Sequence, residues 1–318
     1  MLLKSPARLA PRALRALSTA AAKPTVGFIG LGQMGGRMAE HLRAKGYPLV
    51  VSDPVAANVK PLAEKGAVVA ITPKEVAAQS DTVITMLPST ATVECVFLGK
   101  DGIHEALRPD HVLIDSSTID PLAAKALSTE LHSRGATFVD APVSGGVQGA
   151  QNATLTFMVG GTAAEFETVK PLLEAMGRNI VHCGESSTGQ VAKVCNNLSL
   201  AIQMAGVAEA VNLGVTLGID PAILRNIMNT STGECWSSKV NHPYPGLMPG
   251  TPASNDYKGG FAVNLIRKDL GIAVDVAKTA EVTVPLTHTM HQFYNMMVAQ
   301  GHGNKDFSYV LQFLKGKQ

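Results

Sequence analysis

The hydrophobic pattern changes along the chain and divides it into two parts. In the first part, short runs rich in β-branched residues alternate with segments whose apolar residues recur at helical spacing. The runs predict strands over residues 25–30, 49–53, 81–87, 111–117, 136–142, 155–161 and 179–184. The intervening segments predict helices over residues 32–46, 55–66, 73–80, 121–135 and 163–177. This alternation is typical of an α/β fold with a doubly wound, mostly parallel sheet.

In the second part, the strand pattern stops and only helical periodicity remains. The predicted helices cover residues 191–217, 220–231, 261–280 and 284–301, with a proline-rich loop over 242–252. We therefore expect an α/β domain over residues 23–186 and an all-α domain over residues 187–318. An apolar helical domain of this size also predicts self-association, as a homodimer or homotetramer.

Residues 1–22 have a composition unlike that of the rest of the chain. Arg8, Arg12 and Arg15 follow helical spacing among leucines and hydroxyl residues, and the first acidic residue of the chain is Glu40. A secretory signal would need an unbroken apolar stretch, which is absent here. The segment predicts a mitochondrial transit peptide and the mitochondrial matrix as the location. A disordered basic tail, which would leave the protein in the cytosol, is the alternative.

Charge and cysteine content exclude several classes of function. The formal net charge is only +2, and part of it comes from the N-terminus, so neither a nucleic-acid partner nor a membrane partner is expected. The four cysteines are far apart and form no C-x-x-C pair, which favours ordinary thiols in a reducing compartment. His288 and His291 lack a third ligand at suitable spacing, so no metal site is expected.

A glycine-rich loop follows the first predicted strand. Gly30, Gly32 and Gly35 have G-x-G-x-x-G spacing between a strand and a helix, where backbone N–H groups can hold a pyrophosphate. Asp53 ends the next strand, where a carboxylate can accept hydrogen bonds from a ribose diol and repel a 2′-phosphate. We expect a Rossmann-type domain that binds NAD rather than NADP, through Gly30, Leu31, Gly32, Gln33, Met34, Gly35 and Asp53.

Other strand ends carry residues that could line the same cleft. Ligands of an open sheet lie outside the carboxyl ends of its strands, so Leu87, Pro88 and Thr118 are candidates for the nicotinamide half of the site. These loops could instead serve only to cap the helices that follow them. Similarly, Ser144, Gly145 and Gly146 could form either an anion-binding nest or an ordinary turn.

The helix predicted over residues 191–217 contains polar side chains on an apolar face. Asn196 follows Lys193 by three residues and Asn197 follows it by four. An ammonium and an amide therefore project from the same face of the helix. Beside an NAD cleft, this pair could handle the proton of a substrate hydroxyl. A lysine that merely extends to the surface is the alternative.

Several motifs together resemble the β-hydroxyacid dehydrogenase family, which is related to 6-phosphogluconate dehydrogenase. They are GFIGLGQMG, LP, DSST, DAPVSGG, SSTGQVAKVCNN, CWSS, NDYKGGF, KDLG and KDFSYVLQFL, and they extend from about residue 25 to about residue 314. The resemblance implies that Lys193 is the catalytic lysine, that Asn197 orients the substrate, and that residues 144–146 bind its carboxylate. It further implies that Thr92, Thr118 and Lys268 lie near cofactor or substrate. Ala153 departs from the family, which usually has glycine there, and a positive φ at this position would make alanine costly.

The resemblance also implies an activity. CWSS and YKGGF favour the hydroxyisobutyrate branch, in which NAD oxidises (S)-3-hydroxyisobutyrate to methylmalonate semialdehyde during valine breakdown. Two alternatives remain open at this stage. The first is the same chemistry on another small hydroxyacid, as in a tartronate semialdehyde reductase, and the second is a non-catalytic protein that senses dinucleotides.

Overall fold

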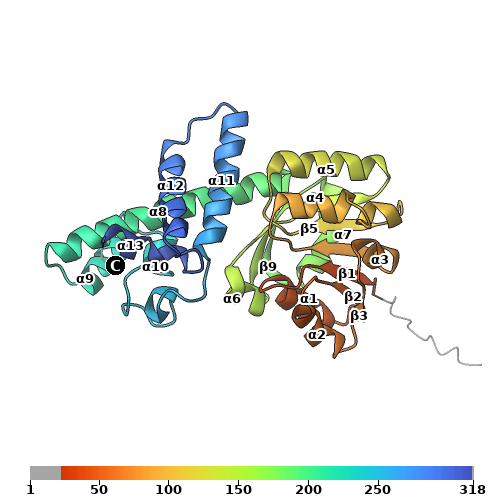
Figure 1. The fold of residues 1–318 in the computed structure, drawn as a ribbon, viewed down its shortest axis with the longest axis horizontal. Helices are drawn as coiled ribbons and strands as arrows, with labels where there is room; N and C mark the ends of the chain where they lie inside the picture. Colours follow the sequence, from red (N-terminus) through yellow and green to blue (C-terminus); the bar gives the residue numbers. More distant parts are fainter. Residues whose placement is uncertain (1–22, 317–318) are drawn as a thin grey trace, which may run out of the picture.

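The computed structural model describes residues 23–316 and has two parts joined by one long helix (Figure 1). The first part is built on a sheet covered by helices, and the second is helical. The predicted transit peptide, residues 1–22, lies outside the described residues. The predicted fold class, a mostly parallel doubly wound sheet followed by an all-α region, is confirmed.

Within residues 23–316, nine strands form one sheet in the order β3-β2-β1-β4-β5-β6-β8-β7, with β9 paired to β8. The six strands from β3 to β6 in this order run parallel, whereas β8 is antiparallel to β6 and to β7. The strand direction thus reverses beyond β6. The strands are β1 (Val26–Ile29), β2 (Leu49–Ser52), β3 (Val68–Val69), β4 (Thr82–Thr85), β5 (Val112–Asp115), β6 (Thr137–Asp140), β7 (Val143–Ser144), β8 (Leu155–Gly160) and β9 (Gly177–Gly184).

Two hydrophobic cores, one on each face of the sheet, hold its helices. One face is covered by α1 (Gly35–Ala44), α2 (Ala56–Ala63) and α7 (Ala163–Leu173). The other is covered by α3 (Pro73–Ala78), α4 (Thr90–Leu98), α5 (Pro121–Ser133) and the 3-10 turn η1 (Ile103–Ala106). Because the central strands are buried on both faces, they are rich in valine, isoleucine and other apolar residues, which is why their runs are visible in the sequence.

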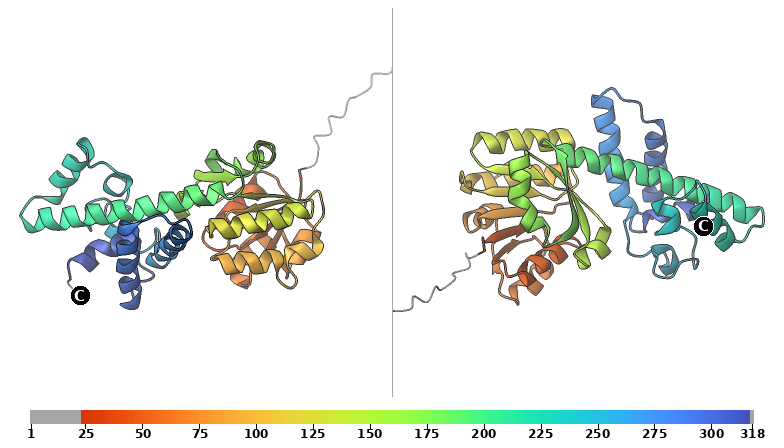
Figure 2. Two further views of the ribbon diagram at one scale, coloured as in Figure 1. Left: turned by 90° about the horizontal axis from the view of Figure 1, so that it is seen from above. Right: turned by 180° about the vertical axis from the view of Figure 1, so that it is seen from behind.

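The helix α8 (Thr188–Thr216) begins at the sheet and ends in the helical part (Figure 2). A third core joins it to α11 (Val263–Thr279), α12 (Pro285–Ala299) and α13 (Val310–Leu314). The remaining elements are α9 (Pro221–Thr230), α10 (Trp236–Lys239), η2 (Pro252–Asn255) and η3 (Phe307–Tyr309). By length and composition α8 could cross a membrane, but it packs against β8, β9 and the helices of the third core. It is therefore a packing helix of the fold.

In the first part of the chain, four strands and α-helices were absent from the sequence prediction, and in the second part the short helices α10 and α13 were absent too. The strand β3 has two exposed residues, and β7 also has only two, so neither produces a clear period. The helix α6 (Gly146–Gln151) begins inside a glycine-rich turn, which conceals it. The helix α4 is rich in threonine and valine, and its amphipathic pattern is weak.

Candidate active site

The loop after β1 has the geometry that its glycine spacing predicts. Gly30 has a φ of 91°, a left-handed conformation that favours glycine. A Cβ atom on Gly35 would lie 1.9 Å from the carbonyl oxygen of Gly30, so α1 can approach the loop only at a glycine. A Cβ on Gly32 would meet no atom within 4 Å, which leaves this position open to an approaching group. The residues present therefore fit a dinucleotide pyrophosphate.

Asp53 lies directly beside this loop. Its Oδ2 accepts a hydrogen bond from the Leu31 N–H at 2.7 Å, and its Oδ1 accepts from the Val55 N–H at 2.8 Å and from Asn58 Nδ2 at 3.0 Å. These bonds fix the carboxylate at the end of β2, where a ribose would lie. Asn58 was missed from the sequence, although an amide in the first turn after a strand-end acid is a recognisable signal. A cavity of about 220 Å³ borders the loop and includes Asn58 in its wall.

A hydrogen bond connects the loops that follow β4 and β5. The Leu87 N–H donates to the Ser117 hydroxyl at 2.8 Å. Ser89 caps α4 by accepting from the Thr92 N–H, and the two hydroxyl groups are 2.8 Å apart. Asp120, rather than Thr118, caps α5. Thr118 is therefore available for contact with a ligand, and it stays partly exposed.

The turn over residues 144–146 opens α6. Gly145 and Gly146 have φ values of 128° and 60°, so both adopt conformations that favour glycine. Ser144 pairs with Thr156 on β8 and is half-buried. Ala153 has a φ of 51°, so this chain does place alanine in a left-handed conformation. Among the described residues, no hydrogen bond joins this turn to Lys193.

Lys193 lies in the second turn of α8 and is only 7% exposed. Burial lowers the pKa of its amine to about 8, while the charge of Asp269 opposes this effect and that of Lys268 adds to it. Within residues 23–316, the amine has no hydrogen-bond or ion-pair partner. A buried amine with this pKa can both accept and return a proton near neutral pH.

Residues from α11 complete the surroundings of this amine. Asp269 Oδ2 accepts a hydrogen bond from Asn197 Nδ2 at 2.6 Å, and Asn196 Nδ2 donates to Asn197 Oδ1 at 3.0 Å. Lys268 Nζ lies 3.1 Å from Asp269 Oδ1 and donates to the Thr118 carbonyl at 2.7 Å. The structure therefore brings Lys193, Asn197, Lys268 and Thr118 together. Asp269 was missed from the sequence, although a carboxylate next to Lys268 on a face with buried Ile266 and Leu270 could have been noticed.

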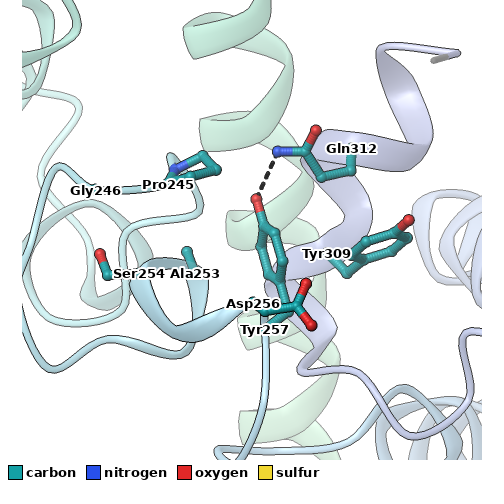
Figure 3. Close-up of a pocket in the computed structure, with 8 residues that line it drawn as sticks. All are labelled: Pro245, Gly246, Ala253, Ser254, Asp256, Tyr257, Tyr309 and Gln312. Carbon is teal, nitrogen blue, oxygen red and sulfur yellow. Dashed lines mark hydrogen bonds between the residues drawn. The ribbon is translucent and has the colours of Figure 1, made fainter. Parts of the chain in front are cut away.

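A second, larger cavity lies away from these residues. It has a volume of about 450 Å³ and lies in the helical part (Figure 3). The Tyr257 hydroxyl there already makes two hydrogen bonds: it donates to the Pro243 carbonyl and accepts from Gln312 Nε2, both at 2.8 Å. None of the candidate site residues lines this cavity, so its size does not make it the catalytic cleft. In the part of the chain that the structure describes, no three His, Cys, Asp or Glu side chains gather to hold a metal ion.

Comparison with known proteins covers both parts of the chain. Residues 25–184 match the NAD-binding domain of 6-phosphogluconate dehydrogenase, and residues 187–314 match the family described as NAD-binding of NADP-dependent 3-hydroxyisobutyrate dehydrogenase. The chain is 50% identical to the probable mitochondrial 3-hydroxyisobutyrate dehydrogenase of Dictyostelium discoideum, over 95% of this chain and 94% of that protein.

Two further relatives are both described with L-serine. An NAD-dependent L-serine dehydrogenase of Pseudomonas aeruginosa is 44% identical over 90% of this chain and 96% of that protein. A solved structure of the Mycobacterium tuberculosis 3-hydroxyisobutyrate dehydrogenase with L-serine has a TM-score of 0.86 and 39% identity, and the match covers 92% of this chain and 99% of that one.

Proposed function

The chain belongs to the 3-hydroxyisobutyrate dehydrogenase family, and on this premise we propose that it oxidises (S)-3-hydroxyisobutyrate to methylmalonate semialdehyde, with Lys193 as the general base. It is an NAD-dependent oxidoreductase that acts on an alcohol. The observation that carries the proposal is the buried amine of Lys193, which is unpaired within residues 23–316 and has a pKa of about 8. An amine in this state is suited to taking the proton of a primary alcohol.

Each neighbouring group has a distinct task in this proposal. A bound NAD would supply the acceptor for the hydride of the alcohol carbon. The neutral amine of Lys193 takes the hydroxyl proton and returns it in the reverse reaction. Asn197 already gives one amide N–H to Asp269, and its second N–H can donate to the substrate oxygen. Asp269 thereby fixes the direction in which the amide faces.

The substrate carboxylate needs a separate set of donors. Ser144 supplies a hydroxyl group, and Gly145 and Gly146 supply backbone N–H groups in a turn. The ammonium of Lys268 adds a positive charge near Thr118. On the cofactor side, Gly30–Gly35 would hold the pyrophosphate and Asp53 the ribose, and Leu87, Pro88, Thr92 and Thr118 would line the remainder. Asp53 favours NAD because its charge would repel a 2′-phosphate.

A substrate panel tests the proposal directly. Purified protein with NAD is assayed by NADH formation against (S)- and (R)-3-hydroxyisobutyrate, L-serine and 3-hydroxypropionate, and in the reverse direction against tartronate semialdehyde. We expect the highest kcat/KM with (S)-3-hydroxyisobutyrate. Lys193→Met should lower kcat by about 10²- to 10⁴-fold, the usual contribution of a general base. Full activity of Lys193→Met in a folded protein would contradict the assignment.

L-serine is a second candidate substrate. It has the same CH₂OH–CH–COO⁻ skeleton as 3-hydroxyisobutyrate and differs by an ammonium group in place of a methyl group. A relative that is 44% identical is named an L-serine dehydrogenase, which is why L-serine belongs in the panel. A higher kcat/KM for L-serine would transfer the assignment to that substrate.

The chain is a mitochondrial protein, as its eukaryotic relatives are named. We further propose that residues 1–22 are a transit peptide that directs it to the matrix, where valine breakdown would use it. The basic residues and the lack of acids in this segment support the proposal. Import of the full chain into isolated mitochondria, with protease protection after outer-membrane rupture, is the expected result. A chain without residues 1–22 should remain outside.

We also propose that the protein is a homodimer or homotetramer. The hairpin of α8 and α9 carries exposed apolar side chains, and within α9 no residue is fully buried. Leu213, Leu217, Ile223 and Ile227 are 63%, 78%, 56% and 48% exposed. An apolar surface of this kind on a helical arm is suited to packing against a second copy.

A further inference from the structure

Gln190 is a buried polar side chain to which the chemistry above gives no role. It is 0% exposed and lies in the first turn of α8. Its Oε1 accepts a hydrogen bond from the Ile119 N–H at 3.1 Å, and its Nε2 donates to the Ser117 carbonyl at 2.8 Å. Its own backbone N–H donates to Asp140 Oδ2 at 2.9 Å. One residue of α8 is thus bonded to the loop that follows β5 and to the last residue of β6.

The two side-chain bonds surround Thr118. Ser117 and Ile119 are the direct neighbours of Thr118, and both are buried, whereas Thr118 is partly exposed. The amide of Gln190 pairs with a carbonyl and with the N–H two residues later, as an adjacent strand would. Lys268 holds the Thr118 carbonyl itself at 2.7 Å. The loop is therefore fixed by side chains from α8 and α11 while Thr118 remains accessible.

The same helix carries the proposed base one turn later. Lys193 follows Gln190 by three residues, which corresponds to about 4.5 Å along the helix axis and to the same side of it. The Asp140 carboxylate also accepts from the Ser187 N–H at 2.7 Å, so the start of the helix is held at the end of β6. The distance between the Thr118 loop and the Lys193 amine is therefore set by a short bonded path through Gln190.

We infer that Gln190 is a positioning residue for hydride transfer. It holds the Thr118 loop against the turn of α8 that carries Lys193, so that the nicotinamide side of the cleft and the amine keep a fixed separation. The inference rests on the proposed function, in which Lys193 is the base. A displacement of about 1 Å between reacting groups can lower a rate by about 100-fold, so a residue without contact to the substrate can matter.

The experiment compares Gln190→Met with Gln203→Met. The two glutamines lie on the same helix, but Gln203 is exposed and its amide bonds only to Ser199. Methionine keeps the length of glutamine and removes both hydrogen-bonding groups. The measurements are kcat and KM, the Kd for NAD by calorimetry without substrate, and hydrogen exchange of a peptide that contains Ile119.

For Gln190→Met we expect kcat to fall by about 10- to 100-fold. The Kd for NAD should change by less than about threefold, because the residues proposed to bind the pyrophosphate and the ribose are unchanged. The peptide containing Ile119 should exchange faster, because the Ile119 N–H has lost its acceptor. Gln203→Met should match the unsubstituted protein in all three measurements. A kcat within twofold of normal, or a loss of kcat matched by an equal loss of NAD affinity, would overturn the inference.

Gln190→Glu decides the matter if the methionine variant does not fold. A protonated carboxyl can accept from Ile119 and donate to Ser117, whereas the carboxylate loses the second bond. Burial and the nearby carboxylates of Asp140 and Asp115 would raise its pKa, and the amines of Lys193 and Lys268 would oppose this. The ratio of its kcat to that of the unsubstituted protein should fall as the pH rises, and a flat ratio would overturn the inference.

The two proposals fail in different ways. Activity retained in Lys193→Met removes the proposed base, whatever Gln190 does. Activity lost in Lys193→Met but retained in Gln190→Met removes only the positioning role.

Discussion

Lys193 is the residue whose protonation state should set the pH dependence of the reaction. Its pKa of about 8 means that the neutral amine, which oxidation needs, becomes more abundant as the pH rises through that value. We expect kcat/KM for oxidation to increase with pH and to level off above about 8. The reverse reduction needs the ammonium, so its kcat/KM should fall over the same interval. Steady-state kinetics in both directions test this, and two profiles that rise together would contradict it.

Asp269 provides a check on that assignment. Its charge raises the pKa of Lys193 and so opposes the effect of burial. Asp269→Asn should therefore move the midpoint of the oxidation profile to lower pH. It should also lower kcat, because Asn197 loses the carboxylate that orients its amide. An unchanged midpoint would mean that Lys193 does not control the profile.

Two glycines of one loop should respond differently to the same substitution. Gly35→Ala places a Cβ 1.9 Å from a backbone oxygen, so we expect a marked loss of folding stability. Gly32→Ala meets no atom within 4 Å and should fold normally, but its Cβ would obstruct the pyrophosphate. We expect the Kd for NAD to rise at least about tenfold, or about 1.4 kcal/mol. Calorimetry and thermal melting distinguish the two, and unaltered NAD affinity in Gly32→Ala would argue against the placement of the cofactor.

At the scale of single residues, the sequence identifies polar groups that stand out from their apolar surroundings. Lys193 and Asn197 were visible because a charge and an amide interrupt an apolar helix. Gln190 was not, because its importance comes from a hydrogen bond to Ile119, 71 residues away in the sequence. No periodicity carries that information.

At the scale of elements, Ala153 is a strained position shortly after α6. Its φ of 51° is costly for alanine but not for glycine. Ala153→Gly should therefore raise the free energy of unfolding by about 1 kcal/mol. The nearby Ala150 is a buried helical residue of α6, and Ala150→Gly should lower it by a similar amount. Urea denaturation measures both, and destabilisation by Ala153→Gly would contradict the explanation.

Whether an element can be predicted from the sequence depends on its length. Strands such as β1 and β5 are buried on both faces, and their apolar runs are enough to predict them. The strand β7 has two residues and pairs antiparallel with β8, so it depends on tertiary contacts. The reversal of the sheet beyond β6 could not be predicted for the same reason.

At the scale of the whole molecule, the exposed apolar side chains on the hairpin of α8 and α9 predict self-association. We expect the unsubstituted protein to elute as a dimer or tetramer in size-exclusion chromatography with light scattering. Leu217→Asp combined with Ile223→Asp should give monomers, because each charge would be buried twice in a symmetric interface. Ile71→Asp is a matched control, since Ile71 is 86% exposed but lies on the α/β part. A monomeric unsubstituted protein would refute the proposed assembly.

The helix α8 begins beside β6 and continues for 29 residues, about 43 Å at the usual rise per residue. The proposed base therefore belongs to the element that connects the two halves, not to either half alone. If the gene were cut at the boundary we propose, near residue 186, the amine would go with the fragment that lacks the dinucleotide loop. Each fragment would then be inert, and only their reassociation could restore turnover.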